Sequence, residues 1–116
     1  MRIHNLYADA KGESHWRDIE VEWVEQRHAS QLSKRFPATG IVFRKVAADY
    51  NLDWHPAPCR QYIVNLDAGV QITASDGEAR VIGAGEVIIV EDTTGKGHLS
   101  KAVEGKIRHC IFVPVE

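Results

Sequence analysis

The stretch GEVIIVEDTTGKGH, residues 85–98, holds the features that decide the fold of this chain. Its first half, Gly85–Glu91, is an apolar run rich in β-branched residues, which is typical of a strand. Its second half is a polar turn with two glycines, which readily adopt positive φ. The stretch ends at His98, where a new strand pattern begins. This succession of strand, turn and strand recurs along the chain.

The TGKG sequence at 94–97 is similar to the end of a phosphate-binding loop, but the rest of that motif is absent. A Walker A loop needs a glycine, four residues and then Gly-Lys-Ser/Thr, between a strand and a helix. Here Lys96 is followed by Gly97, and Val90 stands where the first glycine would be. A strand pattern follows the turn, so the sequence excludes a nucleotide-binding loop of this type.

Segments on both sides of this stretch have the alternation or the short apolar runs of β-strands. The predicted strands lie within residues 16–26, 40–48, 61–66, 70–74, 80–92, 97–103 and 106–116. Asp-Gly at 76–77 is a strong hairpin signal. No segment has a sustained helical period. Many short strands separated by turns indicate an all-β sandwich or barrel.

The length of 116 residues suits a single domain with one core. Residues 1–39 are expected to form an N-terminal arm and an edge strand, because the first 15 are polar and lack a period. Residues 40–116 are expected to form the core of a barrel. The strand around Ile19–Trp23 is expected to cover a sheet edge or to pair across a dimer, since open edges need protection.

Composition and charge narrow the classes of partner. The formal net charge of −2 predicts no general attraction to nucleic acid or to anionic membranes. Cys59 and Cys110 are too few for a disulfide framework and are interpreted as free thiols. The N-terminus has no apolar segment of a signal peptide, and no apolar run is long enough to cross a bilayer. A cytoplasmic location is therefore expected.

Histidines in the β-rich part of the chain are the candidate functional residues. In an extended segment, residues of equal parity share a face. His55, Cys59 and Gln61 thus point the same way, with Ile63 beyond them. A face that is polar at one end and apolar beyond suits the mouth of a barrel that holds a small ligand. In the last strand, either the face of His109 or the face of Arg108, Cys110 and Phe112 is inward, and the pattern leaves this choice open.

Two segments resemble the motifs of the cupin superfamily. In WHPAPCRQYIVNLDAG, His55 matches the first histidine of the first motif, while Ala57 replaces its second histidine and Gln61 its glutamate. In GEVIIVEDTTGKGH, Gly85 and His98 match the second motif, although the usual proline is Glu91 and the loop is two residues longer. The resemblance covers about residues 40–116 and extends to a subgroup of small single-domain bacterial cupins.

This resemblance implies a jelly-roll-like β-barrel of the kind found in RmlC-like cupins, a homodimer, and a divalent metal inside the barrel. Cupins with complete motifs hold the metal by three histidines and a glutamate. Here His55, Gln61 and His98 remain as the implied ligands of Zn, Mn, Fe or Ni. The carbonyl of Gln61 is a neutral and weak donor. Cys59 and His109 are candidates for an additional ligand or for the pocket.

Three classes of function stay open from the sequence. The favoured hypothesis is a metal-dependent enzyme of lyase, isomerase or oxygenase type that acts on a small polar metabolite. A metal-free isomerase or epimerase is the first alternative, with His55 or His98 as base and Glu91 or Asp92 orienting it or donating a proton. A small-ligand binding module without catalysis is the second.

Overall fold

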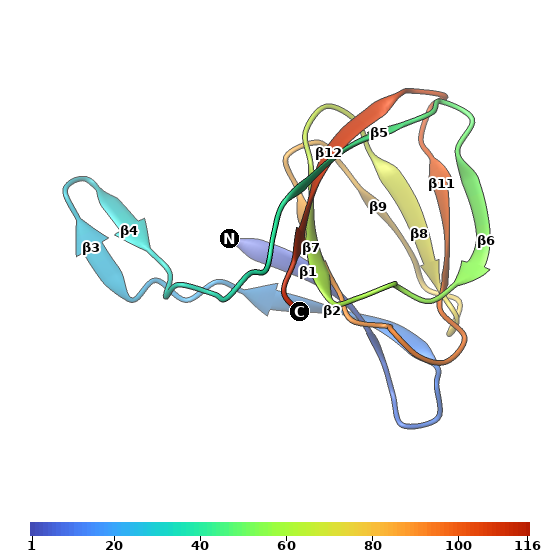
Figure 1. The fold of residues 1–116 in the computed structure, drawn as a ribbon, viewed down its shortest axis with the longest axis horizontal. Helices are drawn as coiled ribbons and strands as arrows, with labels where there is room; N and C mark the ends of the chain where they lie inside the picture. The colour runs from blue at the N-terminus through green and yellow to red at the C-terminus, as the bar shows by residue number, and fades with distance from the viewer.

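The computed structural model describes residues 1–116 and contains strands, turns and no helix (Figure 1). The strands are β1 Arg2–Ala8, β2 Ser14–Glu20, β3 Glu25–Arg27, β4 Ser30–Leu32, β5 Val42–Val46, β6 Asn51–His55, β7 Gln61–Asn65, β8 Val70–Ala74, β9 Ala79–Ile82, β10 Val87–Val90, β11 His98–Ala102 and β12 Arg108–Pro114. There is accordingly no helix with the length and apolarity that crossing a membrane requires.

Two sheets enclose the core. The larger sheet has six strands in the order β2-β1-β10-β7-β12-β5, and the smaller has four in the order β6-β11-β8-β9. Neighbouring strands are antiparallel except β1 and β10, which run parallel. Figure 1 shows the two sheets curving around a common interior. The expected all-β jelly-roll barrel is confirmed.

Alternating residues of both sheets fill the barrel with apolar side chains. One cluster joins the inner faces of the two sheets and contains Leu6, Trp16, Val46, Ala57, Ile63, Val70, Ile72, Ala74, Ile82, Ile88, Val90 and Cys110. The alternation that the pleat produces is clearest in β8, which contributes Val70, Ile72 and Ala74, and in β10, which contributes Ile88 and Val90. Burial of these side chains is the main stabilising term for the barrel, at about 25 cal/mol per Å² of apolar surface.

The first twenty residues belong to the barrel instead of forming a loose arm. Strand β1 lies between β2 and β10, and Leu6 is fully buried. The polar side chain of Asn5 is also buried, because its amide donates to the Ile89 carbonyl at 3.1 Å and to Glu91 Oε1 at 2.8 Å. Polar side chains that are paired in this way can be buried, so the polar sequence of this segment did not mean that it is exposed to solvent. Strand β2 begins at Ser14 and ends at Glu20, so it lies nearer the N-terminus than the expected Ile19–Trp23 strand.

A short hairpin projects away from the barrel. Figure 1 shows β3 and β4 at the end of a long excursion between β2 and β5. The two strands pair only with each other, and almost all of their residues are exposed. Trp23, Val24 and Phe36, which flank the hairpin, are large apolar side chains that are also exposed.

Candidate functional site

His55 and His98 lie against each other at one end of the barrel. His55 ends β6 and His98 begins β11, and the two residues are register partners in that antiparallel pair. Their ring centroids are 4.3 Å apart, with an interplanar angle of 58°. The two motif histidines, separated by a long stretch of sequence, are thus brought together by strand pairing.

The imidazole of His98 is held by a buried carboxylate. His98 Nδ1 lies 2.5 Å from Asp92 Oδ2, and the two residues are 6% and 0% exposed. A carboxylate fixes the tautomer of its histidine by accepting the Nδ1 proton, which leaves Nε2 as a base or a ligand. The other carboxylate oxygen, Asp92 Oδ1, is buried and has no hydrogen-bond partner. The Asp92 carboxylate therefore has His98 as its only hydrogen-bond partner.

His55 is oriented in a comparable way by the backbone. Its Nδ1 donates to the Asp53 carbonyl oxygen at 2.7 Å. Because a carbonyl oxygen only accepts, Nε2 of the neutral ring carries a lone pair. No hydrogen bond occupies the Nε2 atom of either His55 or His98. Two basic nitrogens on facing rings are consequently available at this site.

The loop 91–97 places Asp92 and His98 through two close backbone contacts. The Asp92 carbonyl accepts from the Ala57 N–H at 3.0 Å, and the Gly97 carbonyl accepts from Ser14 Oγ at 2.7 Å. Gly97 has φ of 72°, and a Cβ at this position would collide with the carbonyl group of His55. Glycine is required here both for its backbone conformation and for close approach.

Gln61 lies on the inner face of β7, in the larger sheet, and Cys59 lies in the connection that precedes it. Gln61 is buried at the start of β7, and its Oε1 lies 3.7 Å from Cys59 Sγ, a weak hydrogen bond. Ala57 is buried as well, in the position that the resemblance gives to a histidine. Nowhere in the chain do three His, Cys, Asp or Glu side chains converge as a metal-binding group. The donors present, two imidazoles and a neutral carboxamide, fit a divalent ion only in part.

The structure places Glu91 and His109 away from this pair of histidines. Glu91 Oε2 accepts from Arg60 Nε at 2.9 Å, on the outer surface of the larger sheet. His109 is exposed on β12, where its Nδ1 lies 2.5 Å from Asp67 Oδ2. The backbone N–H of His109 lowers the pKa of Asp67, and its side chain acts in the same direction. The inward face of β12 is that of Arg108 and Cys110.

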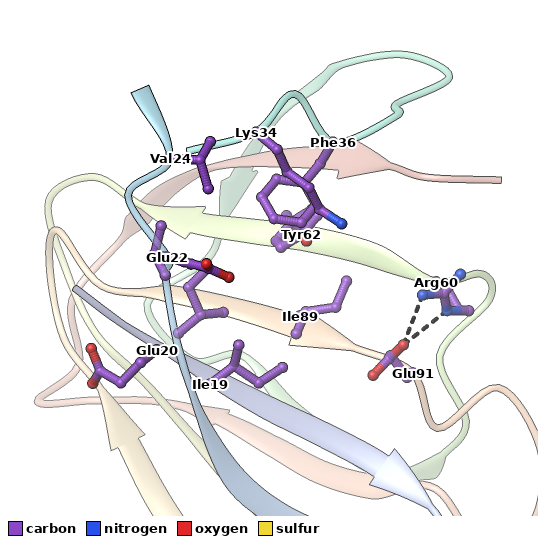
Figure 2. A pocket seen from close by; sticks show the side chains of 12 residues that line it. Ile19, Glu20, Glu22, Val24, Lys34, Phe36, Arg60, Tyr62, Ile89 and Glu91 are labelled. Atoms are coloured by element: carbon purple, nitrogen blue, oxygen red, sulfur yellow. Dashed lines mark hydrogen bonds and ion pairs between the residues drawn. The ribbon is translucent and has the colours of Figure 1, made fainter. Parts of the chain in front are cut away.

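A cavity of 380 Å³ lies on the outer face of the larger sheet, and sequence reasoning did not find it. Figure 2 shows Ile19, Ile89 and Tyr62 lining the cavity, with Phe36 beside Tyr62. The rings of Phe36 and Tyr62 have centroids 6.5 Å apart. Burial raises the pKa of Tyr62. This cavity is separate from the two histidines.

At the histidine end of the barrel the surface is hollowed only slightly. A shallow depression of 340 Å³ is lined by Trp54, Ser75 and Lys96. Trp54 precedes His55, and Ser75 follows Ala74, which is a register partner of His98. Adjacent residues of a strand point to opposite faces, so the depression is near the two histidines along the chain, but neither imidazole lines it.

Comparisons with known proteins agree on the fold. Protein NMB1881 from Neisseria meningitidis aligns with a TM-score of 0.52 and 16% identity over 84% of this chain and 84% of its own. The conserved SPY1581 protein of unknown function from Streptococcus pyogenes aligns with a TM-score of 0.53 and 16% identity over 84% of this chain and 96% of its own. A candidate ethanolamine utilization protein Q from Salmonella typhimurium is a looser likeness, with a TM-score of 0.49 and 10% identity over 100% of this chain and 98% of its own.

No protein-family profile matches the chain, and no curated protein is significantly similar to it. At 16% identity, the likeness to the Neisseria and Streptococcus structures shows a shared fold and carries no activity across. Membership in the cupin superfamily therefore stays a prediction. The all-β jelly-roll barrel fold is shown.

Proposed function

We propose that this protein is a small-molecule enzyme in which His98, oriented by Asp92, moves a proton. The observation that carries this proposal is the buried His98–Asp92 pair, whose free Nε2 adjoins a second free imidazole nitrogen on His55. A histidine with its tautomer fixed by a carboxylate is a general base at neutral pH. His55 is placed to return the proton, which suits an isomerase, an epimerase or a lyase.

The substrate class follows from the chemistry of the two histidines. Two bases with free Nε2 atoms suit a small polar molecule with an acidic C–H next to a carbonyl group. His98 would take that proton, and His55 or His98 would deliver it to the same carbon or to a neighbouring atom. Proton transfer by a positioned side chain typically contributes about 10²- to 10⁴-fold to the rate.

Solvent deuterium exchange tests this proposal without knowledge of the natural substrate. Small hydroxy- and keto-compounds are incubated with the protein in D₂O, and loss of C–H signal is followed by proton NMR. Exchange is expected for at least one compound, and it should disappear in Asp92→Asn and His98→Gln.

The chain supplies a matched control for this test. His109→Gln removes an imidazole paired with Asp67 in the same geometry, but at the exposed surface. This variant should keep the exchange activity of the natural protein. If compounds raise the melting temperature while none exchanges, the protein is a binding module and the catalytic proposal fails.

A divalent metal at the same histidines is the second candidate. Its support is that both imidazoles have Nδ1 engaged and Nε2 free, as in metal-bound histidines. Gln61 would add a neutral oxygen, and a bound Zn, Mn, Fe or Ni ion would act as a Lewis acid on a substrate oxygen. Elemental analysis of untagged protein tests this: stoichiometric metal, lost in His55→Ala and His98→Ala, would support it.

We further propose that the chain is a homodimer and that the projecting hairpin β3–β4 packs on the second copy. Support comes from the hairpin itself, because an isolated pair of three-residue strands that pairs with no other strand is only marginally stable in water. The exposed side chains of Trp23 and Val24 would be buried by such packing. Figure 1 shows that the hairpin extends well beyond its own barrel.

A further inference from the structure

An arginine lies buried in the barrel without a negatively charged partner. Arg108 is on the inner face of β12 and is 4% exposed. It makes one hydrogen bond, from Nη1 to Asn65 Oδ1 at 2.8 Å, and no carboxylate lies within ion-pair distance. Asn65 in turn donates to the Ile82 carbonyl at 3.0 Å, so its oxygen is aimed at the guanidinium. Buried charges are ordinarily paired.

A second unpaired arginine is its diagonal neighbour. In the β5–β12 pair, Arg44 is opposite Cys110 and Val46 is opposite Arg108. Arg44 and Arg108 are thus diagonal neighbours on the inner face, a separation of roughly 7–8 Å between Cα atoms. Arg44 makes no hydrogen bond or ion pair, and its guanidinium packs 5.3 Å from the ring centroid of Tyr50 and 5.0 Å from that of Phe112.

Burial and like charge both act against this arrangement. Burial lowers the pKa of the Arg108 guanidinium from its usual value, and the charge of Arg44 acts in the same direction. Two guanidinium groups on adjacent strands repel each other, and a low-dielectric environment strengthens that repulsion. An arrangement of this kind is destabilising for the protein alone and becomes favourable when an anion lies between the two groups.

The two arginines lie on the edge strand β5 and on its neighbour β12. Strands β5 and β6 are the edges of their sheets and share no hydrogen bonds with each other. Tyr50, in the connection between them, directs its hydroxyl to Ser100 Oγ at 2.7 Å. Arg108 has no polar atom that is both fully enclosed and unpartnered, so its remaining N–H groups reach accessible space. The donors here are two guanidinium groups and two hydroxyls, and no acidic side chain is hydrogen-bonded or ion-paired to either arginine.

We propose that Arg44 and Arg108 form a binding site for a small oxyanion, the carboxylate or phosphate group of a metabolite or the free ion. The planar guanidinium matches the paired oxygens of such a group and binds them bidentately. The Tyr50 and Ser100 hydroxyls can add donors. Ser100 is two residues from His98 on β11, while Arg108 lies beyond Cys110, which pairs with Asn65 at the far end of β7.

Thermal unfolding with added anions tests the proposal. Dialysed protein is titrated with inorganic phosphate, malonate and chloride at constant ionic strength, and the melting temperature is recorded. Phosphate or malonate should raise it in a saturable way, and chloride should not. A response to phosphate alone identifies a phosphate site, and a response to malonate alone a carboxylate site. Broadening of the phosphorus NMR signal of phosphate gives a direct measure of binding.

Substitutions separate an anion site from a structural arginine. Arg108→Met should abolish the response while leaving the melting temperature without anion equal or higher, because an unpaired buried charge is removed. Arg44→Met changes a half-buried side chain and should weaken the rise in melting temperature with added anion. It keeps the test valid if Arg108→Met does not fold. Lys45→Met removes an exposed charge next to Arg44 on β5 and should leave the anion response unchanged. Absence of a saturable response in the natural protein, or an undiminished response in Arg44→Met and Arg108→Met, would overturn the proposal.

Discussion

His98 and Asp92 form the only histidine–carboxylate pair of this protein in which both side chains are buried. Asp92 is adjacent to Glu91, yet the two acids serve opposite sides of the sheet. Glu91 reaches outward to Arg60, while Asp92 turns inward to His98. Adjacent residues of an extended chain point to opposite faces, so one position in the sequence separates a surface ion pair from the candidate site.

Asp92→Asn should reduce catalysis far more than it reduces folding. An amide is nearly the same size as the carboxylate, but it can present its donor to His98 and favour the wrong tautomer. We expect a loss of about 10²-fold or more in proton exchange. Exchange rates measured by proton NMR, beside melting temperatures, check this prediction. Equal exchange in Asp92→Asn and the natural protein would contradict the role given to Asp92.

Gly97→Ala should destabilise the protein by several kcal/mol. The added Cβ would meet the backbone of His55, and the positive φ of 72° adds strain of order 1–3 kcal/mol. Chemical denaturation measures the free energy of unfolding. Gly77→Ala is the matched control, because Gly77 also has positive φ but a Cβ there meets nothing. If both variants lose the same free energy of unfolding, the contact with His55 does not contribute to the destabilisation.

The triad of Asp9, His15 and Asp76 should make stability depend on pH. His15 lies 2.7 Å from Asp9 and 2.9 Å from Asp76, which raises the pKa of His15, chiefly through Asp9, and lowers that of Asp9. The raised pKa of the histidine gives stability that is present below its ordinary value of 6.5 and is lost as pH rises through the folded-state value.

The lowered pKa of Asp9 gives stability that is present above 3.8 and is lost as pH falls through the folded-state value. The contribution of this triad should therefore be largest between pH 3.8 and 6.5. Melting temperatures of the natural protein and His15→Gln across this window check the prediction. A constant difference between the two from pH 5 to pH 9 would contradict it.

Trp23→Asp with Val24→Asp should convert a dimer into a monomer of 13.0 kDa. Both side chains are exposed beside the hairpin, so a charge should not disturb the barrel but should prevent its burial against a second copy. Sedimentation velocity measures the change. Val81→Asp, at an exposed position on β9 in the other sheet, serves as the control. A monomer in the natural protein would defeat the dimer proposal.

The β-class of the fold was predictable because its signal is local. Alternation of side chains and glycine-containing turns mark each strand without reference to its partners. The same rule does not apply between His55 and Gln61, because His55 ends β6 in the smaller sheet and Gln61 begins β7 in the larger one. A cytoplasmic location, by contrast, rests on the sequence alone and stays a prediction.

The place of β1 was not predictable, because its pairing with β10 joins residues more than eighty positions apart. The sequence also left undecided which face of β12 points into the barrel, for a related reason. Both faces carry apolar residues, and only the opposite sheet decides which of Arg108 and His109 is buried. A buried arginine gives no periodic signal, so the sequence could not indicate the Arg44–Arg108 site.

The sequence by itself therefore determined the strands β5 and β7–β12, the turns between them and the exclusion of a phosphate loop at TGKG. Only the tertiary structure decided that His98 meets His55 in register, that Asp92 and not Glu91 holds it, and that β1 completes the barrel. Local pattern fixes the period of each strand. Which strands become neighbours depends on burying apolar faces and satisfying backbone hydrogen bonds across the whole chain.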